Sequence, residues 1–86
     1  MFIARSKKFD KQYKKLPQKT KRQFVQRLKL FLKDPEHTLL HVHNLAGTHR
    51  GSQSFNVNAD VRAVFKIKDG DTIYFSTIGS HSQLYG

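Results

Sequence analysis

The last third of the chain alternates apolar and polar residues with a period of two. The apolar positions are Val61, Ala63, Phe65 and Ile67 in one run and Ile73, Phe75 and Thr77 in a second. Such alternation is typical of half-buried β-strands, with the apolar residues of each run on one face. Between the runs lies Asp69-Gly70, a pair that favours a type I′ turn because both of its central residues need a positive φ. The pattern predicts a β-hairpin whose second strand continues toward the end of the chain.

The first third of the chain predicts a short strand and two helices. Residues 1–5 are mostly apolar, which suits a strand, and Ser6 is a suitable N-cap for the first helix. The apolar stripe of this helix is Phe9, Tyr13 and Leu16. Pro17 ends it, and Asp34-Pro35 ends a second helix near residue 33. Because the link between them is so short, we expect an antiparallel αα-hairpin whose apolar side packs on a sheet.

Two more strands are expected between the second helix and the terminal hairpin. His41, His43 and Leu45 would lie on one face of the first of them, and residues 52–57 would form the other. Residues 47–51 begin and end with glycine and predict a loop. The expected order is β-α-α-β-β-β-β, which is an α+β fold.

Composition narrows the class of protein. With 86 residues, 37% hydrophobic content and seven Phe, the chain can bury one core. It contains no Cys, which excludes a disulfide framework and fits a reducing compartment. No apolar run approaches the ~18 residues of a membrane span, and the N-terminus lacks the apolar segment of a signal peptide. We therefore expect a cytoplasmic protein with no membrane partner.

Positive charge is concentrated in the first 33 residues. The net charge is +10 overall, and residues 1–33 contain twelve Lys or Arg against the single acid Asp10. A basic segment of this density favours a polyanionic partner, nucleic acid before membrane, or an acidic protein that covers it. The alternative is a lysine-rich helix surface that only contacts solvent.

Five residues between His43 and the end of the chain suit the cleavage of an RNA phosphodiester. They are His43, Asp60, His81 and Tyr85, with Arg62 as a clamp for the phosphate. The reaction needs a base for the 2′-hydroxyl, an acid for the departing 5′-oxygen and positive charge beside the phosphorane. His suits either proton-transfer role, since imidazole titrates near neutrality. Each residue also has an ordinary alternative as a surface residue, a turn residue or a packing anchor, and the pattern alone leaves both open.

Other kinds of site find less support in the sequence. The pair His41-x-His43 would place two imidazoles on one strand face, but no Cys and no third ligand at matching spacing accompanies it. No nucleophile elbow is present, and no Gly-rich phosphate loop follows a predicted strand. We expect neither a metal nor a cofactor.

The whole chain resembles the RelE/ParE superfamily of toxins from type II toxin–antitoxin pairs, and most closely its YafQ-like branch. The resemblance lies in the basic helical hairpin with Leu16-Pro17, in His43-Asn44-Leu45-Ala46-Gly47, in Gly51 with Asp60-Val61-Arg62, and in Ile78-Gly79-Ser80-His81-Ser82-Gln83-Leu84-Tyr85. It implies one RelE/ParE-like toxin domain over residues 1–86. It also implies a RelE-like fold, with an N-terminal strand and αα-hairpin packed on a curved, mostly antiparallel sheet of four to five strands.

The resemblance further implies a ribosome-dependent endoribonuclease that cuts mRNA during translation, without a metal or cofactor, and leaves a 2′,3′-cyclic phosphate. His81 would be the principal catalytic His, with His43 and Asp60 in the active site and Tyr85 as its C-terminal aromatic. Substrate-binding residues would be Arg62, Arg50 and Asn56, and the surface facing ribosomal RNA would contain Lys11, Lys14, Lys15, Lys21 and Arg22. Its protein partner would be an acidic antitoxin.

Two positions depart from the YafQ-like pattern. That branch has a second active-site His where this chain has Asn56, and an aromatic residue where it has Val61. Since Asn takes up no proton near neutral pH, the base would have to be His43 or Asp60. Two alternatives to the nuclease stay open at this point, a ParE-like inhibitor of DNA gyrase and a catalytically inactive relative that binds RNA or protein.

Overall fold

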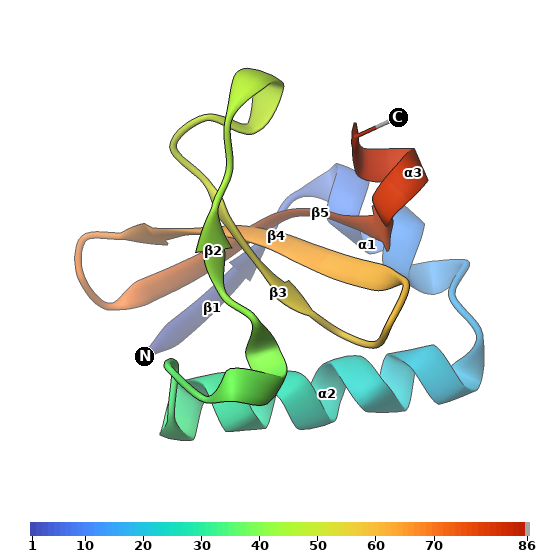
Figure 1. Ribbon diagram of the computed structural model, residues 1–86, viewed down its shortest axis with the longest axis horizontal. Coiled ribbons are helices and arrows are strands. Elements are labelled where there is room, and N and C mark those ends of the chain that lie inside the picture. The colour runs from blue at the N-terminus through green and yellow to red at the C-terminus, as the bar shows by residue number, and fades with distance from the viewer. Residues whose placement is uncertain (86) are drawn as a thin grey trace.

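The computed structural model describes residues 1–85, which form a five-stranded sheet and three α-helices (Figure 1). The elements in chain order are β1 (Phe2–Arg5), α1 (Lys7–Lys14), α2 (Gln18–Lys33), the 3₁₀ helix η1 (Thr38–Leu40), β2 (His43–Asn44), the 3₁₀ helix η2 (Gly47–His49), β3 (Gln53–Asn56), β4 (Val61–Lys68), β5 (Thr72–Ser80) and α3 (His81–Tyr85). Among these residues, no helix is long and apolar enough to cross a membrane.

The strands lie in the order β1-β5-β4-β3-β2. β1 runs parallel to β5, and the other three pairs are antiparallel. The expected α+β fold with a mostly antiparallel sheet is therefore confirmed, and the number of strands is five. The first strand of the chain pairs with the last one, so β5 lies between β1 and β4.

Aromatic side chains fill the space between the sheet and the helices. α2 runs along one face of the sheet (Figure 1), and Phe24 and Phe31 on this helix are buried against strand residues. Phe55 is fully buried, and its ring centroid lies 5.7 to 6.2 Å from those of four other Phe rings. Burial of each such side chain contributes about 1.5–3 kcal/mol. This cluster supports the sheet on the face that α2 covers.

The Asp69-Gly70 turn has the geometry that its sequence predicts. The φ angles are 55° for Asp69 and 76° for Gly70, as a type I′ turn requires. Beyond the turn, the ladder between β4 and β5 slips by one residue, because Phe65 pairs with Phe75 whereas Val64 pairs with Thr77. This β-bulge reverses the alternation in β5.

The expectation that Thr77 shares a face with Ile73 and Phe75 is therefore wrong. Ile78 occupies the core position instead, opposite Ala63. Thr77 turns to the other side, where its hydroxyl donates a hydrogen bond of 2.8 Å to Gln12 Oε1. The physical reason is the extra residue of the bulge, which shifts every later side chain of the strand to the opposite face.

α1 continues the edge of the sheet where β1 ends. The Ser6 N–H donates to the Phe75 carbonyl at 2.9 Å, and Ser6 Oγ donates to the Ser76 carbonyl at 2.7 Å. Ser6 Oγ also accepts from the Phe9 N–H at 2.9 Å, which makes it the N-cap that the sequence predicts. One turn further, Gln12 Oε1 accepts from the Ile78 N–H at 3.0 Å. The side chains of Ser6 and Gln12 thus form hydrogen bonds with backbone groups of β5 that lie beyond the end of β1.

Two segments differ from their expected structure. His41 has a φ of 46° at the end of η1, so it does not lie on a strand beside His43, and β2 contains only His43–Asn44. The left-handed conformation breaks the alternation on which that strand was based. Residues 81–85, expected to continue or follow the last strand, form the short helix α3.

Candidate functional site

α3 is held by a capping box. The Gln83 N–H donates to Ser80 Oγ at 3.2 Å, and the Ser80 N–H donates to Gln83 Oε1 at 2.8 Å. A Cβ on Gly79 would lie 2.8 Å from Gln83 Oε1, so only glycine leaves room for this arrangement. The Ser-x-x-Gln spacing was the signal in the sequence that would have predicted the helix.

His81 and Tyr85 lie one helical turn apart on α3 and face each other. Their ring centroids are 4.8 Å apart with an interplanar angle of 63°. The backbone N–H of His81 donates to the Asp60 carbonyl at 3.1 Å. This bond joins the start of α3 to the turn between β3 and β4. Three of the four residues predicted to be catalytic therefore lie at one corner of the sheet.

Arg62 lies beside this corner but is occupied in the free protein. It sits on β4 opposite Asn56 on one side and Gly79 on the other. Its Nη1 donates to the Asn58 and Ala59 carbonyls at 3.1 and 3.2 Å. The guanidinium thus closes the turn that carries Asp60. A phosphate arriving here would compete with neutral carbonyls, and a charged acceptor makes the stronger hydrogen bond.

Asn56 has a buried oxygen with no partner in the described part of the chain. Its Oδ1 is shielded from solvent and accepts no hydrogen bond there. A buried acceptor without a donor costs about 1–3 kcal/mol, which a donor supplied by a ligand or a rearranged side chain would recover. Its position on β3, opposite Arg62, places this acceptor beside the corner described above.

His43 lies away from the other three residues. It is exposed on the edge strand β2, opposite Ser54, and two strand spacings from β4, which is roughly 10 Å. Its Nδ1 lies 2.8 Å from the His41 carbonyl, and a carbonyl only accepts, so Nδ1 carries the proton. The other ring nitrogen, Nε2, lies 3.4 Å from Ser54 Oγ. This tautomer suits a base, although no contact joins His43 to His81 among the described residues.

His49 is a residue of the site that sequence reasoning missed. Its Nε2 lies 3.0 Å from the Leu84 carbonyl, to which it donates, and its ring centroid is 5.6 Å from that of Tyr85. The loop that contains η2 thus closes on α3. Leu84 and Tyr85 lie 35 and 36 residues further along the chain than His49. No local sequence pattern predicts a contact over that separation.

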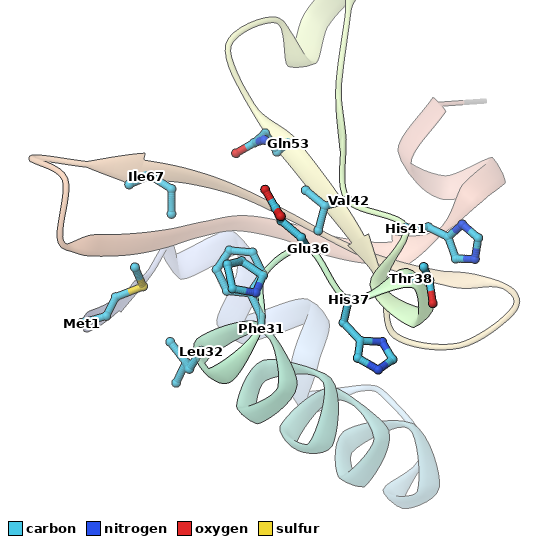
Figure 2. A pocket seen from close by; sticks show the side chains of 11 residues that line it. Met1, Phe31, Leu32, Glu36, His37, Thr38, His41, Val42, Gln53 and Ile67 are labelled. Carbon is cyan, nitrogen blue, oxygen red and sulfur yellow. The ribbon is translucent and has the colours of Figure 1, made fainter.

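Two hollows of the described surface differ in the charge of their lining. One, of about 590 Å³, lies against α3 and is lined by Lys8, Gln12, Thr48, His49, Arg50, Ser52, Lys66, Ser76, Thr77, Gln83 and Leu84. The other, of about 870 Å³, lies between the end of α2 and the segment after it, and Figure 2 shows its lining. The larger hollow is mainly apolar and has Glu36 but neither Lys nor Arg in its lining. None of the predicted site residues lines it.

The predicted basic surface lies around the junction of α1 and α2. Lys11, Lys14, Lys15 and Arg22 are exposed, and Lys21 is half-buried. The Tyr13 hydroxyl donates to the Lys21 carbonyl at 3.4 Å, which ties the two helices together. Within residues 1–85, no group of three or more His, Asp or Glu side chains is arranged to hold a metal ion.

Comparison with known proteins gives a match over the whole chain. The family model described as a bacterial toxin of type II toxin-antitoxin system, YafQ, matches residues 1–86. YafQ from E. coli strain BL21(DE3) is 22% identical, with a TM-score of 0.82, over 98% of this chain and 97% of that chain. In the E. coli DinJ-YafQ toxin-antitoxin complex, the similar chain is 21% identical, with a TM-score of 0.73, over 98% and 96% of the two chains.

Two further solved structures are similar. A metal-bound toxin from Helicobacter pylori is 27% identical, with a TM-score of 0.74, over 99% of both chains. A YoeB/ParE toxin from Agrobacterium tumefaciens is 15% identical, with a TM-score of 0.77, over 94% of this chain and 99% of that chain. A search of the curated proteins found no match.

Proposed function

Because the chain belongs to the YafQ family of toxins from type II toxin–antitoxin systems, within the RelE/ParE superfamily, we propose that it is a ribosome-dependent endoribonuclease that cleaves mRNA and inhibits translation. The observation that carries the proposal is the capped helix α3, which presents His81 and Tyr85 beside the Asp60 turn. A helix of this kind holds a proton donor in one place while leaving it exposed to a substrate.

In the proposed reaction, the 2′-oxygen of the RNA attacks the adjacent phosphorus and the bond to the 5′-oxygen breaks. His81 gives a proton to the departing 5′-oxygen, and His43 or Asp60 takes the proton of the 2′-hydroxyl. The products are a 2′,3′-cyclic phosphate and a 5′-hydroxyl. Every proton is thus accounted for by side chains, and no step is assigned to a metal ion or cofactor.

Arg62 and Asn56 would bind the reacting nucleotides in this scheme. The guanidinium of Arg62 would leave the Asn58 and Ala59 carbonyls for a phosphate oxygen and stabilise the negative charge of the phosphorane. Asn56 Oδ1, which lacks a donor, would accept from a ribose hydroxyl once Arg62 has moved. Tyr85 would position the substrate against His81.

The proposed protein partner is an acidic antitoxin. The net charge of +10 and the exposed lysines around the α1–α2 junction support a polyanionic partner. The E. coli relative is described in a toxin-antitoxin complex with DinJ. An antitoxin segment laid over the basic surface would neutralise it and cover the candidate site, and its affinity would fall as salt increases.

Primer extension on an mRNA translated in a reconstituted system tests the nuclease. We expect cuts that require ribosomes with the wild-type protein, and a loss of about 10²-fold or more with His81→Ala, since this change removes the proposed acid. His41→Asn is the matched control, because it removes an imidazole outside the site and Asn tolerates the left-handed backbone there. Its cleavage should stay at the wild-type level. Intact message with wild-type protein, or full cleavage by a folded His81→Ala variant, would refute the proposal.

A further inference from the structure

The hollow beside α3 is a cationic pocket built from three separate parts of the chain. Lys8 comes from α1, Arg50 follows η2 and Lys66 comes from β4. The remaining lining residues are polar or apolar, and no Asp or Glu occurs among those described. We refer to this hollow as the Lys8–Arg50–Lys66 pocket.

From this arrangement, we propose that the Lys8–Arg50–Lys66 pocket binds a phosphate group of the RNA strand, next to the phosphate that is cleaved. The proposal extends the proposed function and rests on it for the identity of the strand. It assigns Lys8 and Lys66 a binding role and places Arg50 with them rather than with Arg62.

The charge of the pocket favours an anionic ligand. Like charges around one cavity repel each other, and the arrangement is stabilised when an anion enters. The ion pair within residues 1–85 joins Arg5 to Asp10, so none of the three pocket cations is neutralised by a described carboxylate. All three are exposed and can reach a ligand.

The position of the pocket favours RNA over an unrelated anion. Gln83 and Leu84 line it, and they belong to the same short helix as His81 and Tyr85. His49 links the two places, since it lines the pocket and its ring also contacts Tyr85. A strand with its reacting phosphate at His81 has a further phosphate at each neighbouring nucleotide. A second anion-binding site beside α3 suits such a strand.

The polar lining matches phosphate better than it matches a single carboxylate. Thr48 and Ser52 add hydroxyl groups on the loop side of the pocket, and hydroxyls, Lys and Arg are the side chains that most often contact nucleic-acid phosphates. Ser52 is buried, so its position is fixed by the fold. The pocket thereby combines charge from three parts of the chain with the hydroxyl groups of Thr48 and Ser52.

Fluorescence anisotropy with a short, labelled single-stranded RNA carrying 2′-O-methyl groups tests the proposal. This probe has no free 2′-hydroxyl and is not cleaved, so binding is measured apart from catalysis. We compare Lys8→Gln/Lys66→Gln with Lys29→Gln/Lys33→Gln, a pair on α2 with the same loss of charge and with both residues exposed outside the pocket. Thermal unfolding of each variant verifies that it is folded.

For the pocket pair, we expect Kd to rise about tenfold. The slope of log K against log salt should become less steep by about 1.4, since two phosphate contacts on a single strand are lost. The α2 pair should change Kd by less than about twofold. The protein could also bind RNA strongly through the pocket and yet cut no mRNA. That result would refute the proposed nuclease function and would still support the phosphate-binding role of the pocket.

Two results would overturn the proposal. If both pairs of substitutions weakened RNA binding equally, the affinity would depend on the net charge of the protein and not on the pocket. Unchanged RNA affinity in the pocket pair, together with weaker binding of poly-L-glutamate, would assign the pocket to an acidic protein instead.

Discussion

At the scale of single residues, the position of the proposed acid depends on neighbours that do no chemistry. Ser80 and Gln83 exchange two hydrogen bonds, and Gly79 leaves the room that they need. None of the residues of α3 is buried, so packing adds little to its stability. A five-residue helix of this kind persists because its cap is satisfied.

Ser80→Ala should therefore reduce cleavage without unfolding the protein. Loss of an N-cap hydroxyl costs about 1 kcal/mol, which lowers the equilibrium constant for forming the ordered helix roughly fivefold. We expect mRNA cleavage to fall by at most about fivefold, with an unchanged thermal midpoint, since the core is not involved. Ser80→Thr retains the hydroxyl and serves as the control. Wild-type cleavage by Ser80→Ala would show that α3 does not depend on this cap.

At the scale of elements, the bulge in β5 and the helix α1 depend on each other. The bulge turns Thr77 and the Ile78 N–H toward α1, and Gln12 Oε1 accepts from both. Without that acceptor, a partly buried N–H at the centre of the molecule would lose its partner. One side chain of α1 thus fixes the strand that leads directly into α3.

Gln12→Ala should destabilise the fold by about 1–3 kcal/mol, the cost of leaving a buried donor without a partner. Urea unfolding measures the change as a lower midpoint at constant slope. Gln12→Glu keeps an oxygen at the same place and should lose much less. If both variants had the same midpoint urea concentration as the wild-type protein, the hydrogen bond to Ile78 would contribute nothing measurable to the free energy of unfolding.

The sequence predicted those elements whose cause is local. Alternation and the Asp69-Gly70 pair predict the terminal hairpin, and Ser6 and Pro17 delimit α1, because each of these signals acts within a few residues. The bulge at Thr77 and the contact of His49 with α3 depend instead on partners far along the chain, Gln12 and Leu84. The local pattern of apolar and polar residues does not predict contacts with partners so far away in the sequence. The Ser80-x-x-Gln83 cap is the exception, a local signal that the prediction of a continuing strand obscured.

The candidate site shows the same division. The resemblance identified Asp60, His81 and Tyr85, and the fold places them at one corner. It does not reveal that Arg62 is bound to its own turn, nor that Arg50 lies in a separate pocket with Lys8 and Lys66. Those facts follow from how the fold brings together side chains that are distant in the sequence, which motif spacing does not specify.

At the scale of the whole molecule, the charge is divided between two places. The exposed lysines of the α1–α2 junction form one basic area, and the Lys8–Arg50–Lys66 pocket forms another beside α3. We assign the first to long-range attraction of the ribosome and the second to the substrate strand. The two roles differ in what they should do to kinetics.

Lys14→Gln/Lys15→Gln should weaken cleavage on ribosomes while leaving the affinity for short RNA unchanged. Loss of two surface charges lowers the attraction to ribosomal RNA, so the KM for ribosomes should rise by about tenfold at low salt and the difference should shrink as salt increases. Initial rates at varied ribosome concentration measure this, with Lys29→Gln/Lys33→Gln as the control of equal charge. A fall in kcat with constant KM would contradict a docking role.

The sheet order has a consequence for biosynthesis. Phe2–Arg5 leaves the ribosome early, but within residues 1–85 its one neighbouring strand is Thr72–Ser80, which is translated after almost all of the other elements. Until then the sheet lacks an inner strand and the Phe cluster lacks Phe75. His81 follows at once. A nascent chain that stalls before this point has neither a stable fold nor a proposed proton donor. Under the proposed function, a fragment released before this point would therefore lack the proton donor and would not cleave mRNA.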